Sequence, residues 1–593
     1  MQQIRSKALK ALLEQVRKVV DFQRKEWHPR WRQLWEYATG RRPLIPPSLA
    51  ASKDIHIYDS NLIWQTILVK NGMLTLQMPD FWVHFKRHYP NASVLAALIR
   101  SLLRFFWLKG NIQEEIRLAD RYARIVGLCP VRVGYEITPS PHAAKNLTSE
   151  QVAEELLGEA ATLSETIWEE RPVIRHVSPF RFFYDPDIPV PDLNYARWCC
   201  EVLYLTKEQL EALPYRGLDE LTPTAKRSDL IGTQDREALK DIAYYEVWNV
   251  WDKDTGTRIL YAPSVPDKTI QVEDIETPLP NFFPYELWTI YDIPDSPQAM
   301  GDAELLLTPV MTFNYLRTIE LNFATRLLPR FFYRQGALTE QGKRALEAGS
   351  LLQGIEVASD ESLSNVVMPF IPSALPQELL LVENTIREDV TTLSGVTDFH
   401  RGIPLPTKRL ATEVTLLAQL SGVRGQIEQQ RFDMFLSRVV SKFYHVLRHF
   451  IPEPFYVPLE TPEGMTLQPV ALADLPEDAE IFIVSGGGVV DRVLERREII
   501  ELFKFIAQAG LPISVWVPFV GRLLATFNIH PEEVQTVLSA LKIAAAQQQL
   551  MQQAATMAQV SGVAHQSLQH AQEAESASAV EGLAGAGEEE VEA

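Results

Sequence analysis

The 593-residue chain lacks the patterns that define secreted and membrane-spanning proteins. Its three cysteines, Cys129 and the adjacent pair Cys199 and Cys200, have neither the number nor the spacing of a disulfide framework or a zinc site. No stretch approaches about 18 consecutive apolar residues, so we expect no transmembrane helix. The first 20 residues alternate charges with Leu and Val at helical spacing and contain no signal-peptide cleavage site. These absences predict an intracellular, reducing setting without a membrane partner.

Basic residues are too few for a protein that coats nucleic acid. The chain has 57 Lys and Arg against 76 Asp and Glu, a formal net charge of -19. This excludes a generally basic surface but permits a wall past which nucleic acid slides, because like charges repel. Apolar residues make up 46% of the chain, which is enough for a substantial core. At about 150 residues per domain, the length suggests roughly four structural units.

Two glycine clusters come near nucleotide-binding motifs without completing them. The segment from Gly336 to Lys343 has five residues between its glycines, and Arg344 stands where a phosphate loop has Ser or Thr. The triple glycine 486–488 lies between an expected strand and an expected helix but lacks the acidic residue that follows a dinucleotide turn. A nucleotide-dependent nucleic-acid enzyme built on these clusters is therefore the competing hypothesis, not the first choice.

Other catalytic patterns are also missing. His445 and His449 share a helical face, but Val446 stands in place of a metalloprotease glutamate, and no third ligand is evident. No G-x-S-x-G nucleophile elbow is present. We therefore predict that the protein is not an enzyme, with no catalytic residue, metal site or cofactor.

What the sequence does contain is a helix, an irregular loop and a much longer helix. Residues 377–394 have a helical pattern that breaks at Gly395. Pro404 and Pro406 forbid a continuous helix through the next segment. Apolar residues then recur at three- and four-residue steps from about Thr407 to Phe450. Such a helix is longer than an ordinary globular core requires, and it suggests something other than a compact monomer.

The rest of the chain alternates helical and strand-like segments. We expect two helices within residues 1–40, one or two within 94–126, an acidic helical insertion over 148–170, and a helix over 302–328. Residues 244–263 alternate apolar and polar side chains around an Asp-Thr-Gly turn, which predicts a β-hairpin. Thr206 is a candidate helix N-cap, with Glu208 in the first turn. Asp185 and Asp187, on either side of a proline, are expected to be turn residues.

The C-terminal region predicts self-association. Ile543, Leu550, Met557 and Ala564 recur every seven residues in an Ala/Gln-rich helical stretch. Such a stripe cannot be buried by one helix, so we expect neighbouring subunits in a ring or barrel. A cytoplasmic coiled-coil scaffold, which would form elongated dimers or trimers, is the alternative.

Several segments resemble one family in the order in which they occur. LSGVTDFHRGIPLPTKRLATEV, followed by an Arg/Gln/Glu-rich helix, is similar to the tunnel-loop segment of tailed-phage portal proteins, the head-to-tail connectors. RPVIRHVSPFRFFYDPD with the later ARW strand, and NFFPYELWTIYDIPD with the helix that follows it, also resemble portal segments. Pro284, Tyr285, Gly301 and Asn314 match the family pattern of strand, turn and helix. The resemblance is to podovirus-type portals and spans most of residues 25–510.

The resemblance implies a mainly α, mixed α/β, ring-forming portal fold with wing, stem, clip and crown. Its parts would be the N-terminal wing with helices and a β-rich part (1–300), the first stem helix (301–328), the clip (329–376), the second stem helix (377–395), the tunnel loop (396–409), the long wing helix and return strand (410–490), the crown and C-terminal helical barrel (491–575), and a disordered acidic tail (576–593).

The resemblance also implies the site residues and partners. The tunnel loop would line the narrowest part of a DNA channel and contact phosphates through His400, Arg401, Lys408 and Arg409 without reading bases. On the residues alone, these side chains could equally solvate a loop or cap helices. The clip would dock partners through Arg330, Phe331, Phe332, Tyr333 and Arg334. The expected partners are further copies in a dodecamer, double-stranded DNA, the terminase large subunit, capsid and scaffold proteins, and tail or head-completion proteins. The expected location is the capsid vertex of the virion, after assembly in the host cytoplasm.

Overall fold

The computed structural model describes about two thirds of the chain. The described residues are 2–4, 6–50, 55–76, 78–139, 168–211, 215, 218–226, 243–275, 279–326, 330–333, 335–336, 338–341, 343–344, 367–370, 377–396, 423–450, 455–461, 464–470, 475–484, 540 and 543. The chain divides into two compact units, 1–458 with 467–485, and 459–466 with 486–593. Everything that follows concerns the first unit.

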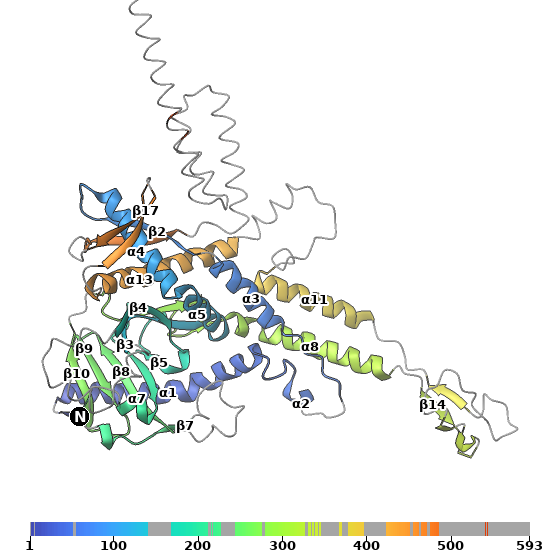
Figure 1. Cartoon of the computed structure of the whole chain (residues 1–593). Helices are drawn as coiled ribbons and strands as arrows, with labels where there is room; N and C mark the ends of the chain where they lie inside the picture. The colour runs from blue at the N-terminus through green and yellow to red at the C-terminus, as the bar shows by residue number, and fades with distance from the viewer. Residues whose placement is uncertain are drawn as a thin grey trace, which may run out of the picture. The chain divides into compact units, whose positions relative to one another are not determined.

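The structure is mixed α/β, with about 52% helix and 21% strand, so helix predominates as the sequence predicts. Figure 1 shows a β-rich region beside α1 and a group of helices that includes α3, α8 and α11. No helix in the described ranges is both long and apolar enough to cross a bilayer.

One long helix, α1 (Lys7–Ala38), replaces the two helices expected within residues 1–40. Pro29 lies inside it and removes one backbone hydrogen bond. The apolar stripe nevertheless continues past the proline, and Val20, Trp27, Trp31 and Leu34 are all buried. The prediction of two helices was therefore wrong, because packing along the whole stripe outweighs the local effect of the proline.

The first buried face of α1 lies against a seven-stranded antiparallel sheet. The sheet has the order β1-β10-β9-β8-β6-β5, with β7 paired to β8. Its strands are β1 (Gln2–Gln3), β5 (Phe182–Tyr184), β6 (Trp198–Leu205), β7 (Ala225–Lys226), β8 (Ala243–Asp252), β9 (Thr257–Tyr261) and β10 (Lys268–Asp274). The predicted hairpin is confirmed as β8 and β9, which pair from Trp248–Tyr261 to Asp252–Thr257.

The predicted turn and cap residues have the expected local roles. Thr206 accepts a hydrogen bond from the Gln209 N–H (3.3 Å), and the Gln209 side chain accepts one from the Thr206 N–H (3.1 Å). This reciprocal capping box begins α7 (Lys207–Glu211). Asp185 is a buried turn residue whose carboxylate accepts from Arg197 Nε at 2.7 Å. Arg197 holds the pKa of Asp185 below its usual value although burial opposes this.

His28 lies on α1 with its ring against aromatic side chains. It stacks on Trp31 with ring centroids 5.6 Å apart, and the Phe180 ring, which follows Pro179 in the 3-10 helix Pro179–Arg181, lies 5.3 Å away. Burial, together with the charges of Arg24 and Arg32, lowers the pKa of His28 to about 3. The imidazole is therefore neutral at pH 7.

This histidine predicts a pH dependence of stability. An unfolded histidine titrates near pH 6.5, so between about pH 3 and 6.5 the unfolded chain binds a proton that the folded chain does not. The free energy of unfolding should therefore fall as the pH drops below about 6.5, by at most about 1.4 kcal/mol per pH unit. Urea unfolding between pH 7 and pH 5 should show a flatter dependence for His28→Phe. His88→Phe, at an exposed position, is the control, and equal slopes for His28→Phe and wild type would refute the assignment.

A second group of elements surrounds a three-stranded sheet. β3 (Leu128–Pro139) pairs with β11 (Tyr285–Thr289) on one side and with β4 (Trp168–His176) on the other. The helices α3 (Leu62–Thr75), α4 (Ala92–Lys109) and α5 (Ile112–Val126) belong to this group, with the short α2 (Pro47–Ala50) before them. The expected helices within 94–126 are thus confirmed as α4 and α5. The acidic helix expected over 148–170 is wrong at its end, since 168–170 extend β4 along β3; the rest lies outside the described residues.

The predicted sequence of helix, strands, helix and long helix is present in the described segments. α8 (Asp302–Arg326) is followed by β14 (Arg330–Tyr333), β15 (Val367–Phe370), α11 (Gln377–Ser394) and α13 (Val423–Phe450). β14 and β15 pair antiparallel. The smaller strands are β12 (Tyr291–Asp292) paired with β13 (Ala299–Met300), β16 (Phe455–Thr461) with β17 (Gly464–Val470), and β18 (Ala479–Val484) with β2 (Asp80–Phe85).

Candidate functional site

The sequence-predicted site residues lie mostly beyond the described segments. His400, Arg401, Lys408 and Arg409 fall outside them, as do the first turns expected for the long helix and Arg334. Of the clip set, Arg330, Phe331, Phe332 and Tyr333 make up strand β14. The functional surfaces that can be built from described side chains therefore lie on either side of the predicted tunnel loop, on α8, α11 and α13.

α8 and α11 form an antiparallel pair. Arg317 of α8 makes ion pairs with Glu320 on its own helix at 3.0 Å and with Glu383 of α11. Farther along, Val390 of α11 belongs to the same buried cluster as Val310 near the start of α8. Burial, with Glu320 beside it, raises the pKa of Glu383. Figure 1 shows α11 returning alongside α8, so residues 327–376 connect the two helices at one end of the pair.

α8 also holds an extended segment along its side. Asn314, Thr318 and Asn322 occur every four residues and bind the backbone of residues 56–60. Asn314 Oδ1 accepts from the Ser60 N–H at 3.2 Å, and Asn322 Nδ2 donates to the His56 carbonyl at 2.8 Å. The sequence singled out Asn314 only by resemblance, whereas its contacts show a structural role.

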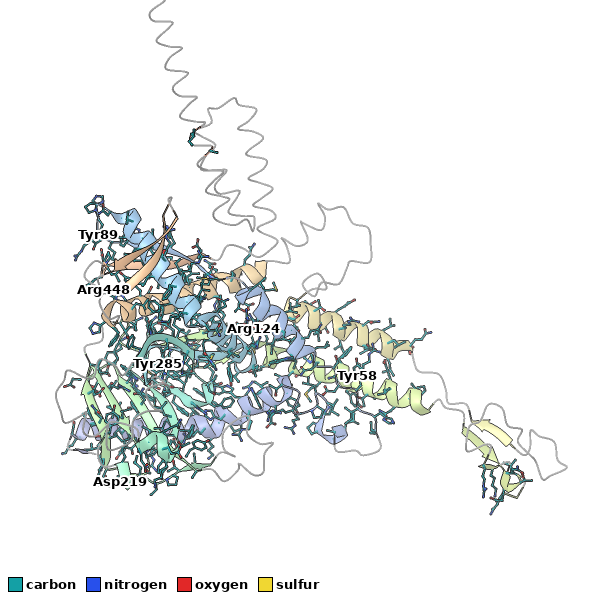
Figure 2. All side chains as sticks on the ribbon, viewed as in Figure 1. Tyr58, Tyr89, Arg124, Asp219, Tyr285 and Arg448 are labelled. Carbon is teal, nitrogen blue, oxygen red and sulfur yellow. The ribbon has the colours of Figure 1, made fainter. Side chains whose placement is uncertain are left out.

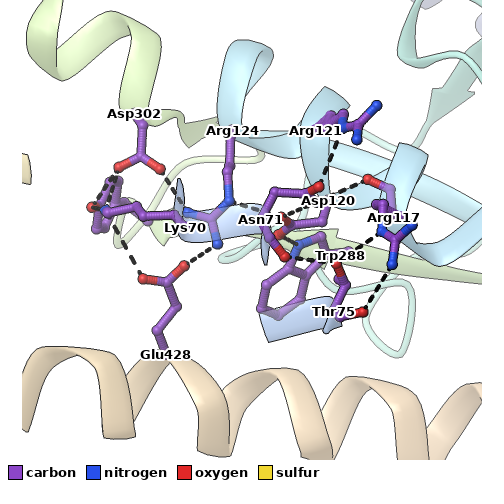
Figure 3. Close-up of polar contacts among 11 residues, drawn as sticks. Lys70, Asn71, Thr75, Arg117, Asp120, Arg121, Arg124, Trp288, Asp302 and Glu428 are labelled. Atoms are coloured by element: carbon purple, nitrogen blue, oxygen red, sulfur yellow. Dashed lines mark hydrogen bonds and ion pairs between the residues drawn. The ribbon is translucent and has the colours of Figure 1, made fainter. Parts of the chain in front are cut away.

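A buried cluster of charges joins the start of α8 to α3, α5 and α13. We call Lys70, Asp120, Arg124, Asp302 and Glu428 the junction network (Figure 3). Arg124 donates to Asp120 and to Asp302, both at 2.8 Å, and also pairs with Glu428. Lys70 donates to Asp302 at 2.6 Å. Because Arg124, Asp120 and Asp302 are fully buried, the charges depend on one another for neutralisation.

Polar neighbours complete the junction network. Asn71 donates to Asp120 at 2.8 Å, and Trp288 Nε1 donates to the other Asp120 oxygen at 2.9 Å. Burial favours the neutral form of Asp302, but Lys70 and Arg124 outweigh it and hold the pKa of this carboxyl below its usual value. Burial likewise opposes the charge on Arg124, yet its three carboxylate partners raise the pKa of Arg124 well above the ordinary value. The network is therefore charged at neutral pH and fixes the angle between four helices.

Backbone contacts close beside the network leave no room for side chains. A Cβ added to Gly301 would lie 2.6 Å from the Arg124 carbonyl oxygen, and one added to Gly127, at φ +102°, would lie 2.0 Å from that of Ala299. Glycine is required at both positions, because the end of α5 touches the start of α8 through the backbone.

The long helix α13 grips strand β11 and its extension with three basic side chains. Arg431 pairs with Asp292 at 2.5 Å, and Arg438 pairs with Glu286 at 3.1 Å. Lys442 is buried, pairs with Glu286 at 2.9 Å and donates to the carbonyls of Phe283 and Tyr285. Figure 2 marks Tyr285 and Arg124, the latter in the neighbouring junction network; both side chains are buried. Together with Glu428, these residues make α13 a rigid continuation of the predicted tunnel loop.

α3 is apolar all round, yet one face is uncovered. Ile63, Ile67 and Leu74 are buried in the core. The opposite face exposes Leu68 (42%), Met73 (46%) and Leu76 (63%). Helices with apolar residues on every side are normally enclosed by other elements. A single copy of the chain therefore leaves a surface that a further protein surface is expected to cover.

α11 and α13 present further exposed apolar side chains. Leu380, Leu381 and Val382 are exposed in the first turns of α11, and Leu381 (67%) lies almost opposite the contact with α8. On α13, Ile427 and Met434 are seven residues apart and exposed. These uncovered faces lie on the same helices that the junction network fixes.

The described residues contain no group of three or more His, Cys, Asp or Glu side chains that could hold a metal ion. Lys343, from the near-match to a phosphate loop, pairs with Glu340 at 2.8 Å. The three cysteines are buried, and burial raises their pKa values well above the usual one, so they are poor nucleophiles.

Comparison with known proteins gives no relative. No protein-family model matches the chain, and no curated protein matches it.

Proposed function

We propose that this chain is a phage portal protein, a subunit of the ring through which double-stranded DNA enters and leaves a capsid. The observation that supports this most directly is the order and pairing of elements. Two antiparallel helices, α8 and α11, are joined through a region that contains the paired strands β14 and β15, and are followed by the long helix α13. In this proposal they are the two stem helices, the clip and the long wing helix.

Ring formation accounts for the uncovered apolar faces. A second copy of the chain would cover α3 and the exposed turns of α11, because a closed ring gives each subunit the same two neighbours. The junction network then has a mechanical role, since it holds α8, the first stem helix, at a fixed angle to α13. Force on one stem helix would be passed to the long helix of the same subunit through Asp302, Arg124 and Glu428.

DNA would pass the segment that precedes α13. His400, Arg401, Lys408 and Arg409 lie between the end of α11 and the start of α13 in the sequence. Repeated in a ring, they would form belts of positive charge in a chain of net charge -19. Such belts contact phosphates without reading bases, while the acidic remainder prevents tight binding. The packaging motor, docked at the clip through β14 and Arg334, would supply the energy.

The proposal is tested by negative-stain electron microscopy of the purified protein together with its particle mass. We expect rings with a central hole and a mass near twelve times 67.3 kDa. Small rods with the mass of a dimer or trimer would instead support the coiled-coil scaffold. ATP hydrolysis that is lost in Lys343→Ala would support the nucleotide-dependent enzyme and contradict the portal proposal.

A further inference from the structure

A cavity of about 720 Å³ lies beside the middle of α1, and arginines from separate parts of the chain line it. Arg24 and Arg32 come from α1, Arg42 from the segment after it, and Arg181 from the end of the 3-10 helix Pro179–Arg181. We call this cavity the arginine groove. Its lining includes four arginines and two glutamates, a formal charge of 4 - 2 = +2, in a chain of net charge -19.

One glutamate of the groove is already neutralised. Glu246 accepts from Arg24 Nη2 at 2.5 Å and from the Trp248 indole N–H at 2.6 Å. Arg24 also donates to the Tyr204 hydroxyl at 3.2 Å. Arg24 and Glu246 thus form a closed pair, and the positive charge of the groove resides on its other arginines.

Arg42 and Arg181 are held by aromatic rings. The Arg181 guanidinium lies 5.3 Å from the centre of the Tyr204 ring, and that of Arg42 lies 5.3 Å from the centre of the Tyr37 ring. Within the described part of the chain, no carboxylate makes an ion pair with either guanidinium. Stacking fixes the plane of a guanidinium and leaves its in-plane N–H groups for a two-pronged acceptor such as phosphate.

His28 supplies an independent sign of a missing ligand. It lines the groove, and its Nε2 atom is buried without a hydrogen-bond partner among the described residues. Buried polar atoms are almost always hydrogen-bonded, so this nitrogen indicates a partner that is not part of the chain. A neutral imidazole with its proton on Nε2 would donate to an anionic oxygen.

We propose that the arginine groove binds a small phosphate-bearing anion, such as pyrophosphate or the phosphates of a nucleotide. Arg42, Arg181 and His28 would donate to the phosphate oxygens. A volume of about 720 Å³ suits a ligand of nucleotide size, and Tyr122 and Phe180 in the lining offer rings on which a base can stack. The proposal does not depend on the portal function, because every residue of the groove lies within a single copy of the chain.

The test is isothermal titration of the full-length protein at low salt with pyrophosphate and, separately, with ATP. We expect saturable binding that Arg42→Ala and Arg181→Ala each weaken at least about tenfold, because each removes a charge-assisted bidentate contact. Arg41→Ala is the matched control: Arg41 stacks on Trp35 and is not among the lining residues. Equal affinity for both ligands would mean that the groove reads phosphate alone. Tighter binding of ATP would mean that the base is also held.

Site mapping keeps the proposal testable if Arg181→Ala does not fold. Phenylglyoxal modification of the wild-type protein, read by mass spectrometry, should be slowed by pyrophosphate at Arg42 and Arg181 and unchanged at Arg41. No saturable binding of either ligand up to about 10 mM would overturn the proposal. So would binding that neither substitution weakens, or binding of a polyglutamate peptide in place of both phosphate ligands.

Discussion

Arg124→Met is expected to lower the free energy of unfolding by about 3–5 kcal/mol. Arg124 is fully buried and faces three carboxylates, those of Asp120, Asp302 and Glu428. Methionine fills much of the same space but leaves these carboxylates with Lys70 as the remaining buried cation of the network. The measurement is the urea midpoint followed by tryptophan fluorescence, since Trp288 donates directly to Asp120.

Two further variants separate the buried charge from the arginine side chain itself. Arg100→Met, on the exposed face of α4, makes the same chemical change where Arg100 bonds only to the Ala96 carbonyl, and should cost less than about 0.5 kcal/mol. Arg124→Met combined with Asp302→Asn should cost less than the sum of the two single changes, because removing both partners leaves fewer unpaired charges. Additive costs, or an Arg124→Met effect as small as that of Arg100→Met, would contradict the described network.

Leu68→Glu is expected to abolish assembly and leave a folded single chain. Leu68 is 42% exposed on α3, so a charge there can stay in water when the chain is alone. Against a neighbouring subunit the same carboxylate would be buried without a partner, which costs several kcal/mol per interface. In a closed ring this cost recurs at every contact. Mass photometry should therefore show particles of 67.3 kDa in place of the wild-type assembly.

The control for Leu68→Glu places the same charge elsewhere. Gln15→Glu lies on the exposed side of α1, away from the uncovered apolar faces, and should assemble as the wild type does. Far-UV circular dichroism of both variants should match the wild type, because neither side chain is buried in the single chain. Normal assembly of Leu68→Glu would show that α3 is not a subunit contact. The assembly surface would then have to be sought on the exposed turns of α11 or α13.

Much of the fold followed from local sequence because it depends on short-range chemistry. The β8–β9 hairpin follows from alternation around a turn, and the start of α7 from the Thr206 capping box. α11 follows from its apolar spacing and from Gly395, which has φ +69°. In each case the residues that decide the structure are neighbours in the chain, so their pattern is visible without knowing what packs against them.

The candidate site was only partly predictable. Arg431 was recognised as one of several polar residues at the start of the long helix, but its bonds to Asp292 and to the Ile290 carbonyl could not be foreseen. Asp120, Arg124 and Lys70 have the spacing of ordinary charges on helices, and nothing in their own segments indicates burial. The arginine groove likewise combines residues from α1, from the 3-10 helix after β4 and from β8.

The sequence by itself determined the types and order of the elements, the excess of negative charge, and the helix–loop–long-helix pattern from which the portal proposal arose. Only the tertiary structure decided that α1 continues through Pro29, that β2 pairs with the distant β18, and that five charges meet beneath the start of α8. The physical reason is that helix and turn formation depend on adjacent residues, whereas burial of a charge depends on partners that the chain brings together only on folding.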